Sequence, residues 1–524
     1  MAARMLHIVN GKLTAPTDAQ AVRDMMSDAW ESSPTRHLVF HFHGGLIDHK
    51  TGVGIAERLA PVYEGTDPVL SDRTPTGASP CFIIWDSGVL ESLTHNLPDI
   101  ARDPLFQKLM GKVGKWVLKK VSGGIGLKGV AGSGIDGAEV EAEMHAYFSG
   151  ALPNPPSVLE AAGARLKAPE TGPTVKSIAD DLDENELAAE IRAVDIDQDL
   201  EFQDIVRAAA NGTKPPPVAG VASKGVGAIT VSKSPITDAG AERLFGRPQT
   251  AVTKGVFNWV SVAREIAVIV IRVIRRFHEH RDHGMYITIS EEILRDLYVD
   301  DGGGILWNQM KKDTADAFVK PDFGGSVLLQ TLKDMAAETP SRAFSRVTLI
   351  GHSTGAVFIC NVIDAAVRAA IPGRFEVIFL APAVTHRRFA STLAANRASI
   401  TAFRQFGMHD ALEAKDSIVP IVYPHSLLYF VSGLLEWSDE ADALIDEPLV
   451  GMERYVTTIP PFDALAFADV ETVRAFLTAA GANRAVWSDA SLGAGMNSTS
   501  HTHGDFDNDP TTLDSVAHIL RQGF

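Results

Sequence analysis

Five consecutive residues, GHSTG at positions 351–355, have the spacing of a serine nucleophile held on a tight turn. Acyl transfer needs a serine whose Oγ stands clear of the sheet, and a sharp turn between a strand and a helix provides this. Glycines two residues before and two residues after Ser353 remove the side chains that would collide across such a turn. An apolar run at residues 346–350 precedes the motif and a helical pattern at 356–370 follows it, so we expect Ser353 to be the nucleophile.

A second motif, HFHGGL at residues 41–46, ends another apolar run and has the glycines of an oxyanion-binding loop. The tetrahedral intermediate of acyl transfer carries a negative oxygen, which backbone N–H groups stabilise. One donor is expected from Thr354, the residue after the nucleophile. The other is expected from Gly44 or Gly45, where no Cβ blocks the approach of a substrate. His43 is expected to brace this loop through hydrogen bonds.

The serine also needs an imidazole within hydrogen-bond reach to accept its proton. The polar sequence SHTHGDFD at residues 500–507 holds two histidines between the last apolar run and the last helical pattern. A loop in this place can bring a base over the edge of a sheet. We predict His503, which Gly504 follows, as the general base, with His501 as the alternative.

A carboxylate must then orient the imidazole and stabilise its cation. Two aspartates follow the apolar run at residues 400–407: Asp410, in FGMHDAL, and Asp416, in KDSIVP. Asp410 lies shortly after the run, as expected for an acid at the end of a strand, whereas Asp416 lies in the segment that leads to the next helical pattern. The two candidates are close to even, with Asp410 slightly ahead.

These residues need a frame that brings them together, and the two ends of the chain have the pattern of one. Short apolar runs rich in strand formers alternate there with helical patterns. Strands that alternate with helices form parallel sheets, in which side chains after the strands meet at one edge. The sequence therefore predicts an α/β fold, with strands at residues 5–9, 37–42, 81–85, 346–350, 375–381, 400–407 and 485–487.

The composition excludes several classes of protein. With 48 Lys and Arg residues against 65 Asp and Glu residues, the formal charge is −17, which disfavours nucleic-acid binding. The hydrophobic fraction of 45% supports a large core, and two cysteines cannot form a disulfide framework. Arg264, Glu265 and Arg272 interrupt the most apolar stretch, residues 256–274, so we expect a buried helix there rather than a membrane span. We see no signal-peptide pattern and expect a cytoplasmic protein.

The middle of the chain, residues 89–340, lacks the alternating pattern and contains two charged stretches. Residues 109–128, from Leu109 to Lys128, interleave lysines with apolar residues. We expect a helix that packs Trp116 inward and leaves its lysines in solvent. The alternative interpretation is a lid that makes peripheral contact with anionic lipid. Residues 177–203 are strongly acidic and predict a solvated helix.

Taken in order, HFHGGL, GHSTG and SHTHGDFD resemble the α/β-hydrolase superfamily, in particular its lipase-like and esterase-like members. The resemblance covers roughly residues 1–88 and 341–524, the two expected parts of the core. It implies a mostly parallel sheet, a Ser-His-acid triad, hydrolysis through an acyl-enzyme, and no cofactor or metal. The glycine loop and the nucleophile lie about 310 residues apart, farther than in compact esterases, so residues 89–340 are expected to form an inserted, mainly helical cap.

This resemblance implies a serine hydrolase that cleaves a carboxylic ester, as a carboxylesterase or lipase does. Its expected substrate is a small-molecule or lipid ester. Three alternatives stay open: a phospholipase at a membrane surface, a peptidase or thioesterase with the same triad, and a non-catalytic binding protein on a hydrolase scaffold.

Overall fold

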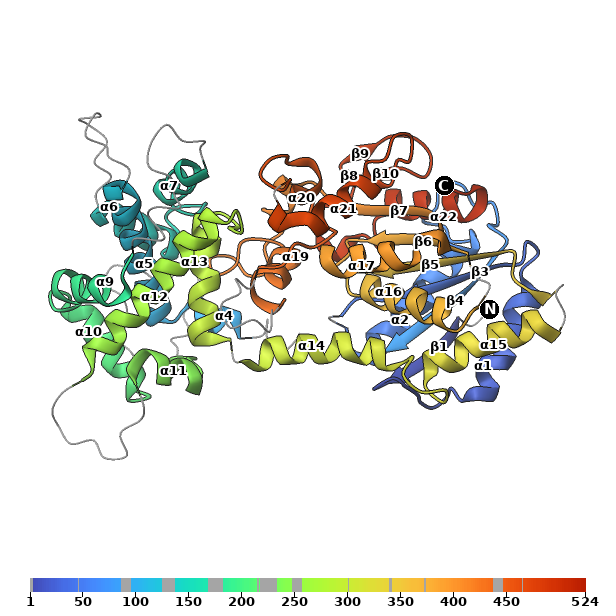
Figure 1. Ribbon diagram of the computed structural model, residues 1–524, viewed down its shortest axis with the longest axis horizontal. Helices are drawn as coiled ribbons and strands as arrows, with labels where there is room; N and C mark the ends of the chain where they lie inside the picture. The colour runs from blue at the N-terminus through green and yellow to red at the C-terminus, as the bar shows by residue number, and fades with distance from the viewer. Residues whose placement is uncertain are drawn as a thin grey trace.

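The structure, a computed structural model, has a sheet covered by helices at one end and a bundle of helices at the other (Figure 1). The first and the last elements, β1 and α22, both lie at the sheet end. The predicted α/β class, with a mostly parallel central sheet flanked by helices, is confirmed. The residues that the structure describes are 3–45, 47–85, 96–124, 137–167, 182–213, 216, 233–246, 257–299, 301–338, 342–371, 374–436, 446–463 and 465–524.

Eight strands form the sheet, in the order β2-β1-β4-β3-β5-β6-β7-β8. Neighbouring strands are parallel, except that β2 pairs antiparallel with β1 at the edge. Every residue of β3 and β4 is buried, as expected for central parallel strands covered on both faces. The strands are β1 (Arg4–Val9), β2 (Lys12–Leu13), β3 (His37–Phe42), β4 (Ala78–Trp85), β5 (Arg346–His352), β6 (Phe375–Leu380), β7 (Ile400–Met408) and β8 (Ala485–Ser488).

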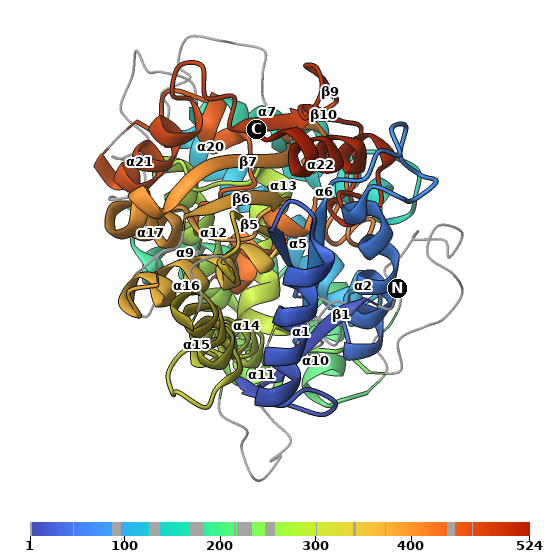
Figure 2. The same ribbon diagram turned by 90° about the vertical axis from the view of Figure 1, so that its right-hand side faces the viewer.

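Two hydrophobic cores lie on the two faces of this sheet. Successive residues of a strand point to opposite faces, so Leu38 and Phe40 of β3 join one core and Val39 joins the other. The helices α1 (Ala19–Ser32), α16 (Gly355–Arg368) and α17 (His386–Asn396) fill the first core, and α2 (His49–Glu64) and α22 (Pro510–Gln522) fill the second. Seen from the sheet end, α15 (Gly324–Glu338) lies beside α1 (Figure 2).

The register of the central strands fixes where the predicted motifs lie. Phe42 at the end of β3 pairs with Gly351 near the end of β5, and His352 pairs with Leu380 at the end of β6. The strands are parallel, so the glycine loop after β3 and the serine after β5 leave the sheet at the same edge.

A helical lobe, made of α5–α7 and α9–α13, lies away from the sheet, and α14 runs from this lobe toward it (Figure 1). Among the described residues, no strand lies between β4 and β5, in agreement with a mainly helical middle region. Besides α15, which lies beside α1, the α-helices between β4 and β5 are α4 (Leu97–Ala101), α5 (Pro104–Gly124), α6 (Gly137–Phe148), α7 (Ser157–Lys167), α9 (Glu184–Ile191), α10 (Leu200–Ala210), α11 (Asp238–Phe245), α12 (Trp259–His278), α13 (Met285–Ile293) and α14 (Asp301–Asp316).

The basic stretch and the acidic stretch of the lobe bind each other. Trp116 of α5 is fully buried, as predicted, and its indole N–H donates to Asp195 at 2.9 Å. The prediction of solvated lysines is wrong for Lys112, which is 2% exposed and pairs with Asp195 at 3.0 Å and with Asp199 at 2.9 Å. Lys119 and Lys120 of the same helix pair with Glu190. The prediction of one solvated acidic helix is also wrong, since its described part forms two helices, α9 and α10, and each of them buries apolar side chains.

The most apolar stretch of the sequence forms a helix of the lobe. The most apolar predicted stretch, residues 256–274, corresponds to α12, which is buried along one side within the lobe. Among the described residues, none of the helices has both the length and the apolar composition that a bilayer span requires.

Shorter elements complete the sheet part after β7. They are α18 (Asp410–Glu413), α19 (Leu427–Phe430), α20 (Arg454–Thr457), α21 (Ala468–Leu477), β9 (Ala490–Ser491) and β10 (Asn497–Ser498).

Candidate active site

Ser353 occupies a strained turn between β5 and α16. Its φ is +52°, in the left-handed region that side chains other than glycine rarely adopt. The backbone holds the turn in place, because the Ser353 N–H donates to the Leu380 carbonyl at 2.9 Å and its own carbonyl accepts from the Ala383 N–H at 3.0 Å. The end of β6 therefore fixes the serine, as expected of a nucleophile that must not move.

The two glycines of the motif are required by close contacts across the turn. A Cβ on Gly351 would lie 2.7 Å from the carbonyl carbon of Gly355. A Cβ on Gly355 would collide with the carbonyl oxygen of Phe42. The glycine spacing of the motif thus has a steric cause in this fold. The absence of side chains at these two positions lets the serine turn pack directly against the end of β3.

The glycine loop after β3 contacts the serine turn. A Cβ on Gly44 would lie 3.3 Å from Cβ of Ser353, and a Cβ on Gly45 would lie 2.5 Å from Oγ1 of Thr354. The same Cβ on Gly45 would lie 2.7 Å from Sδ of Met310, on α14. The structure therefore brings together the three residues that were predicted to supply oxyanion donors.

His43 braces this loop as a neutral ring. Its Nδ1 lies 2.9 Å from the Gly44 carbonyl, and its Nε2 accepts the Trp85 N–H at 3.2 Å, so the proton is on Nδ1. Burial lowers the pKa of His43 to about 4. His43 is thus a fixed support of the loop, as the sequence suggested, and not a group that titrates near neutral pH.

His503 faces the same pocket as Ser353. It is 6% exposed, and neither ring nitrogen has a hydrogen-bond partner among the described residues, so its ring is not hydrogen-bonded to Ser353 Oγ. Its backbone is held on both sides: the N–H donates to Asp416 Oδ2 at 2.7 Å, and the carbonyl accepts from His352 Nε2 at 3.0 Å. Burial, and then the neighbouring His352, hold the pKa of His503 well below its usual range, which keeps the ring neutral.

Of the two predicted acids, the structure brings only Asp416 to the pocket. Asp410 instead accepts a hydrogen bond from the Tyr429 hydroxyl at 2.5 Å, and its N–H donates to Glu453 at 2.8 Å. The slight preference for Asp410 is not supported, because α18 begins directly at this residue and turns its carboxylate away. Burial, and then Asp505, raise the pKa of Asp416 against the lowering effect of the His503 N–H.

His501, the alternative base, lies elsewhere. Its side chain is 57% exposed, and its Nε2 lies 2.5 Å from Asp489 Oδ1 on the surface. It does not line the pocket that Ser353 and His503 share. Of the two histidines in the loop, only His503 lines the pocket together with Ser353.

The shared pocket has a volume of about 780 Å³. Ser353, His503, Asp416 and both loop glycines line it. Apolar side chains from three separate segments form much of the remaining wall: Ile47, Ile55, Pro98, Ile418, Val419 and Leu427. A concave, largely apolar site with a few convergent polar groups is typical of a small-molecule site.

Two features of the site were not anticipated from the sequence. The ring of His352 stacks on that of His503, with the ring centroids 5.4 Å apart. Arg58 of α2 binds Asp507 across the pocket wall, with Nη2 3.1 Å from Oδ2, and so ties α2 to the histidine loop. His352 stands in the variable position of the motif, and no local pattern around Arg58 or Asp507 signals their pairing.

No group of three or more His, Cys, Asp or Glu side chains in the described part of the chain is arranged to hold a metal ion. Comparison of the chain with protein-family models, with curated proteins and with solved structures gave no match.

Proposed function

We propose that this protein is a serine hydrolase of the α/β-hydrolase type that cleaves carboxylic esters through an acyl-enzyme. One observation carries the proposal: a strained serine, a glycine loop and a buried neutral histidine, from three distant parts of the chain, line one pocket. Backbone strain of this kind persists only where the surroundings enforce it, and it concentrates at functional sites.

The proposed roles follow from the geometry. Ser353 Oγ attacks the ester carbonyl, while His503 accepts its proton and later returns it to the leaving alcohol. Asp416 stabilises the imidazolium that forms. The N–H groups of Thr354 and of Gly44 or Gly45 bind the oxyanion, and the loss of one such donor typically lowers kcat by on the order of a hundredfold or more. Water then releases the acid from Ser353 by the same steps.

An ester with an apolar acyl or alcohol group fits the pocket best. Its wall is mainly aliphatic, and Arg58, the arginine that lines it, is already paired with Asp507. Among the described residues that line the pocket, no unpaired cation would offset the repulsion between Asp416 and a strongly anionic substrate. The chemistry of the wall therefore favours an uncharged small-molecule or lipid ester.

A phospholipase at a membrane surface has less support. The basic helix that could contact anionic lipid, α5, uses Lys112, Lys115, Lys119 and Lys120 in ion pairs with carboxylates of the lobe. Lys128, the last residue of the predicted stretch, lies outside the described residues. A peptidase or thioesterase would use the same three groups, so activity on parallel substrates must separate these reactions.

The test is hydrolysis of p-nitrophenyl esters of increasing acyl length, acyl thioesters, phospholipid vesicles and aminoacyl amides, measured side by side. We expect the highest kcat/KM on the oxygen esters, and no activity above background in Ser353→Ala and His503→Gln. His501→Gln is the matched control and should keep wild-type activity. Equal activity of Ser353→Ala and wild type would exclude the proposal, and a clear preference for thioesters or amides would replace the ester assignment.

A further inference from the structure

A tight turn at residues 418–425 forms part of the pocket wall. Val419 and Tyr423 exchange backbone hydrogen bonds of 3.3 and 2.9 Å, and the Ile418 N–H donates to the His425 carbonyl at 3.2 Å. Ile421, at the tip, has a φ of +79°. A β-branched residue is strained in this left-handed conformation, so contacts from outside must hold the turn.

Hydrogen bonds to this turn come from α13, a helix of the helical lobe. The Tyr286 hydroxyl donates to the Ile421 carbonyl, and the Ser290 hydroxyl donates to the Val422 carbonyl at 2.7 Å. The Tyr423 hydroxyl donates in the opposite direction, to Glu291 Oε1 at 2.5 Å. Three successive residues of the turn are thus bound, one after another, to the same buried face of α13.

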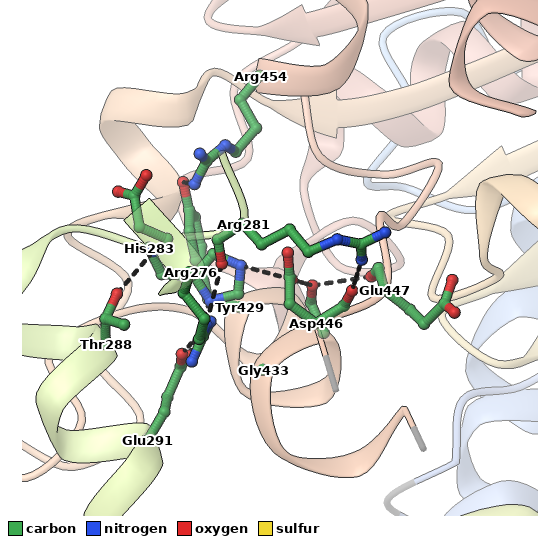
Figure 3. A network of polar contacts seen from close by, with 12 residues as sticks. Arg276, Arg281, His283, Thr288, Glu291, Tyr429, Gly433, Asp446, Glu447 and Arg454 are labelled. Carbon is green, nitrogen blue, oxygen red and sulfur yellow. Dashed lines mark hydrogen bonds and ion pairs between the residues drawn. The ribbon is translucent and has the colours of Figure 1, made fainter. Parts of the chain in front are cut away.

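The face of α13 is itself fixed by a fully buried charge network (Figure 3). Arg276 Nη2 lies 2.7 Å from Glu291 Oε2, and His283 Nδ1 lies 2.8 Å from Glu291 Oε1. On its other side, His283 Nε2 lies 2.9 Å from Oδ1 of Asp446, a residue of the sheet part. Removal of one partner from such a network leaves an uncompensated buried charge, so the network holds α13 firmly against the sheet part.

The other end of the same segment reaches the candidate base. Ile418 and Val419 line the pocket. Just before them, Asp416 accepts the backbone N–H of His503 at 2.7 Å. Fewer than ten residues therefore connect a helix of the lobe to the backbone of the base.

The geometry points to a role for the helical lobe in catalysis: Tyr286 and Ser290 of α13 are positioning residues that set the place of His503 through the turn and Asp416. They touch no reacting atom. Their hydroxyls hold the strained turn, the turn fixes Asp416, and Asp416 fixes the histidine loop. This inference rests on the proposed function, in which His503 is the base, and it gives the large insertion a task other than covering the pocket.

Two pairs of variants test the inference. Tyr286→Phe and Ser290→Ala each remove one hydroxyl from the turn. Tyr298→Phe and Ser234→Ala are the matched controls, because each removes a hydroxyl that donates to buried Asp103 inside the lobe, at 2.7 and 2.5 Å. The measurements are Tm, kcat and KM on the best ester, and amide hydrogen exchange of the peptides that contain Asp416 and His503.

In the two turn variants, we expect the amide of His503 to exchange its hydrogen faster than in wild type. We also expect their kcat to fall about tenfold more than that of the control variants, when variants with an equal loss of Tm are compared. The inference is overturned if the turn exchanges faster while the His503 amide keeps its wild-type rate, or if kcat falls equally in both pairs.

The exchange measurement needs no turnover, and this separates the two claims. A wild-type protein without hydrolase activity would exclude the proposed function. A His503 amide that does not respond to either turn variant would exclude the positioning role, even if the ester is hydrolysed through Ser353.

Discussion

Asp416 accepts the backbone N–H of His503, at 2.7 Å, and not a ring nitrogen of the same residue. The carboxylate therefore holds the histidine loop, while both ring nitrogens of His503 are buried without a hydrogen-bond partner. Catalytic hydrogen bonds of a free enzyme are often long and tighten when substrate binds. Asp416 lines the pocket with His503, whereas Asp410 is bound to Tyr429, so we propose Asp416 as the acid.

The first prediction separates the two aspartates. Asp416→Asn keeps an oxygen that can accept the His503 N–H but loses the negative charge, so the loop should stay in place while the imidazolium loses its stabilisation. We expect kcat to fall on the order of a hundredfold or more with little change in Tm. Asp410→Asn is the matched control and should keep wild-type kcat. A larger loss in Asp410→Asn would show that the assignment of the acid is wrong.

The second prediction concerns the oxyanion loop. In Gly45→Ala the new methyl group meets Thr354 Oγ1 and Met310 Sδ, so the loop must move away from the serine turn. We expect kcat to fall by roughly 10²-fold, the typical effect of a lost oxyanion donor. Gly54→Ala, in α2, places its methyl in open space and should keep full activity. Steady-state kinetics of both variants checks this, and equal activities would argue against the loop as the oxyanion site.

The third prediction is a pH profile. Burial and His352 lower the pKa of His503, and the base works only when neutral, so kcat/KM should stay high as pH falls below about 6.5. In His352→Gln the amide can still donate to the His503 carbonyl, but the imidazole that lowers the pKa of His503 is gone. The acid limb should therefore move to higher pH. Profiles of kcat/KM from about pH 4 to about pH 8 measure this shift; an unmoved or lowered limb would contradict it.

The fourth prediction concerns stability of the junction between the lobe and the sheet part. Burial opposes the charge on His283, but Glu291 and Asp446 outweigh it and raise the pKa of His283. When folding raises the pKa of a group, that group stabilises the folded state fully at pH values below its pKa in the unfolded chain. This stabilisation is lost as the pH rises through the pKa of the group in the folded state. Burial alone would raise the pKa of Glu291, yet His283 and Arg276 lower it to about 2, so its contribution is lost as pH falls from about 4.5 toward that value.

The free energy of unfolding should therefore decline above about pH 6.5 and again below about pH 4.5. His283→Gln should cost about 3–5 kcal/mol near neutral pH and should lose the alkaline decline. Denaturant unfolding across this range provides the measurement. A variant whose alkaline slope equals that of wild type would show that His283 does not carry the charge.

Local signals in the sequence were enough to find the frame of the site. Strand β3 has its predicted bounds, because six apolar or aromatic residues end at a glycine pair. The serine turn was found because its glycines are needed by contacts within a few residues of each other and with β3. His503 was preferred over His501 on the strength of one neighbouring glycine, and the structure brings His503 alone to the pocket.

Pairings between distant segments could not be found in this way. The choice between Asp410 and Asp416 depends on how the chain turns after β7, which no local pattern specifies. Lys112 and Asp195 lie 83 residues apart, so each was interpreted separately as a solvated charge. The hydrogen bonds from α13 to the turn at residues 418–425 likewise depend on how the lobe meets the sheet part.

The most direct measurement of the central claim is mass spectrometry of the folded protein after treatment with a fluorophosphonate. This reagent labels a serine only when a base and an oxyanion site activate it. We expect a single adduct on the peptide that contains Ser353, none in Ser353→Ala, and a greatly slowed reaction in His503→Gln. Folded wild-type protein that stays unlabelled, or that carries the adduct on another serine, would contradict the account.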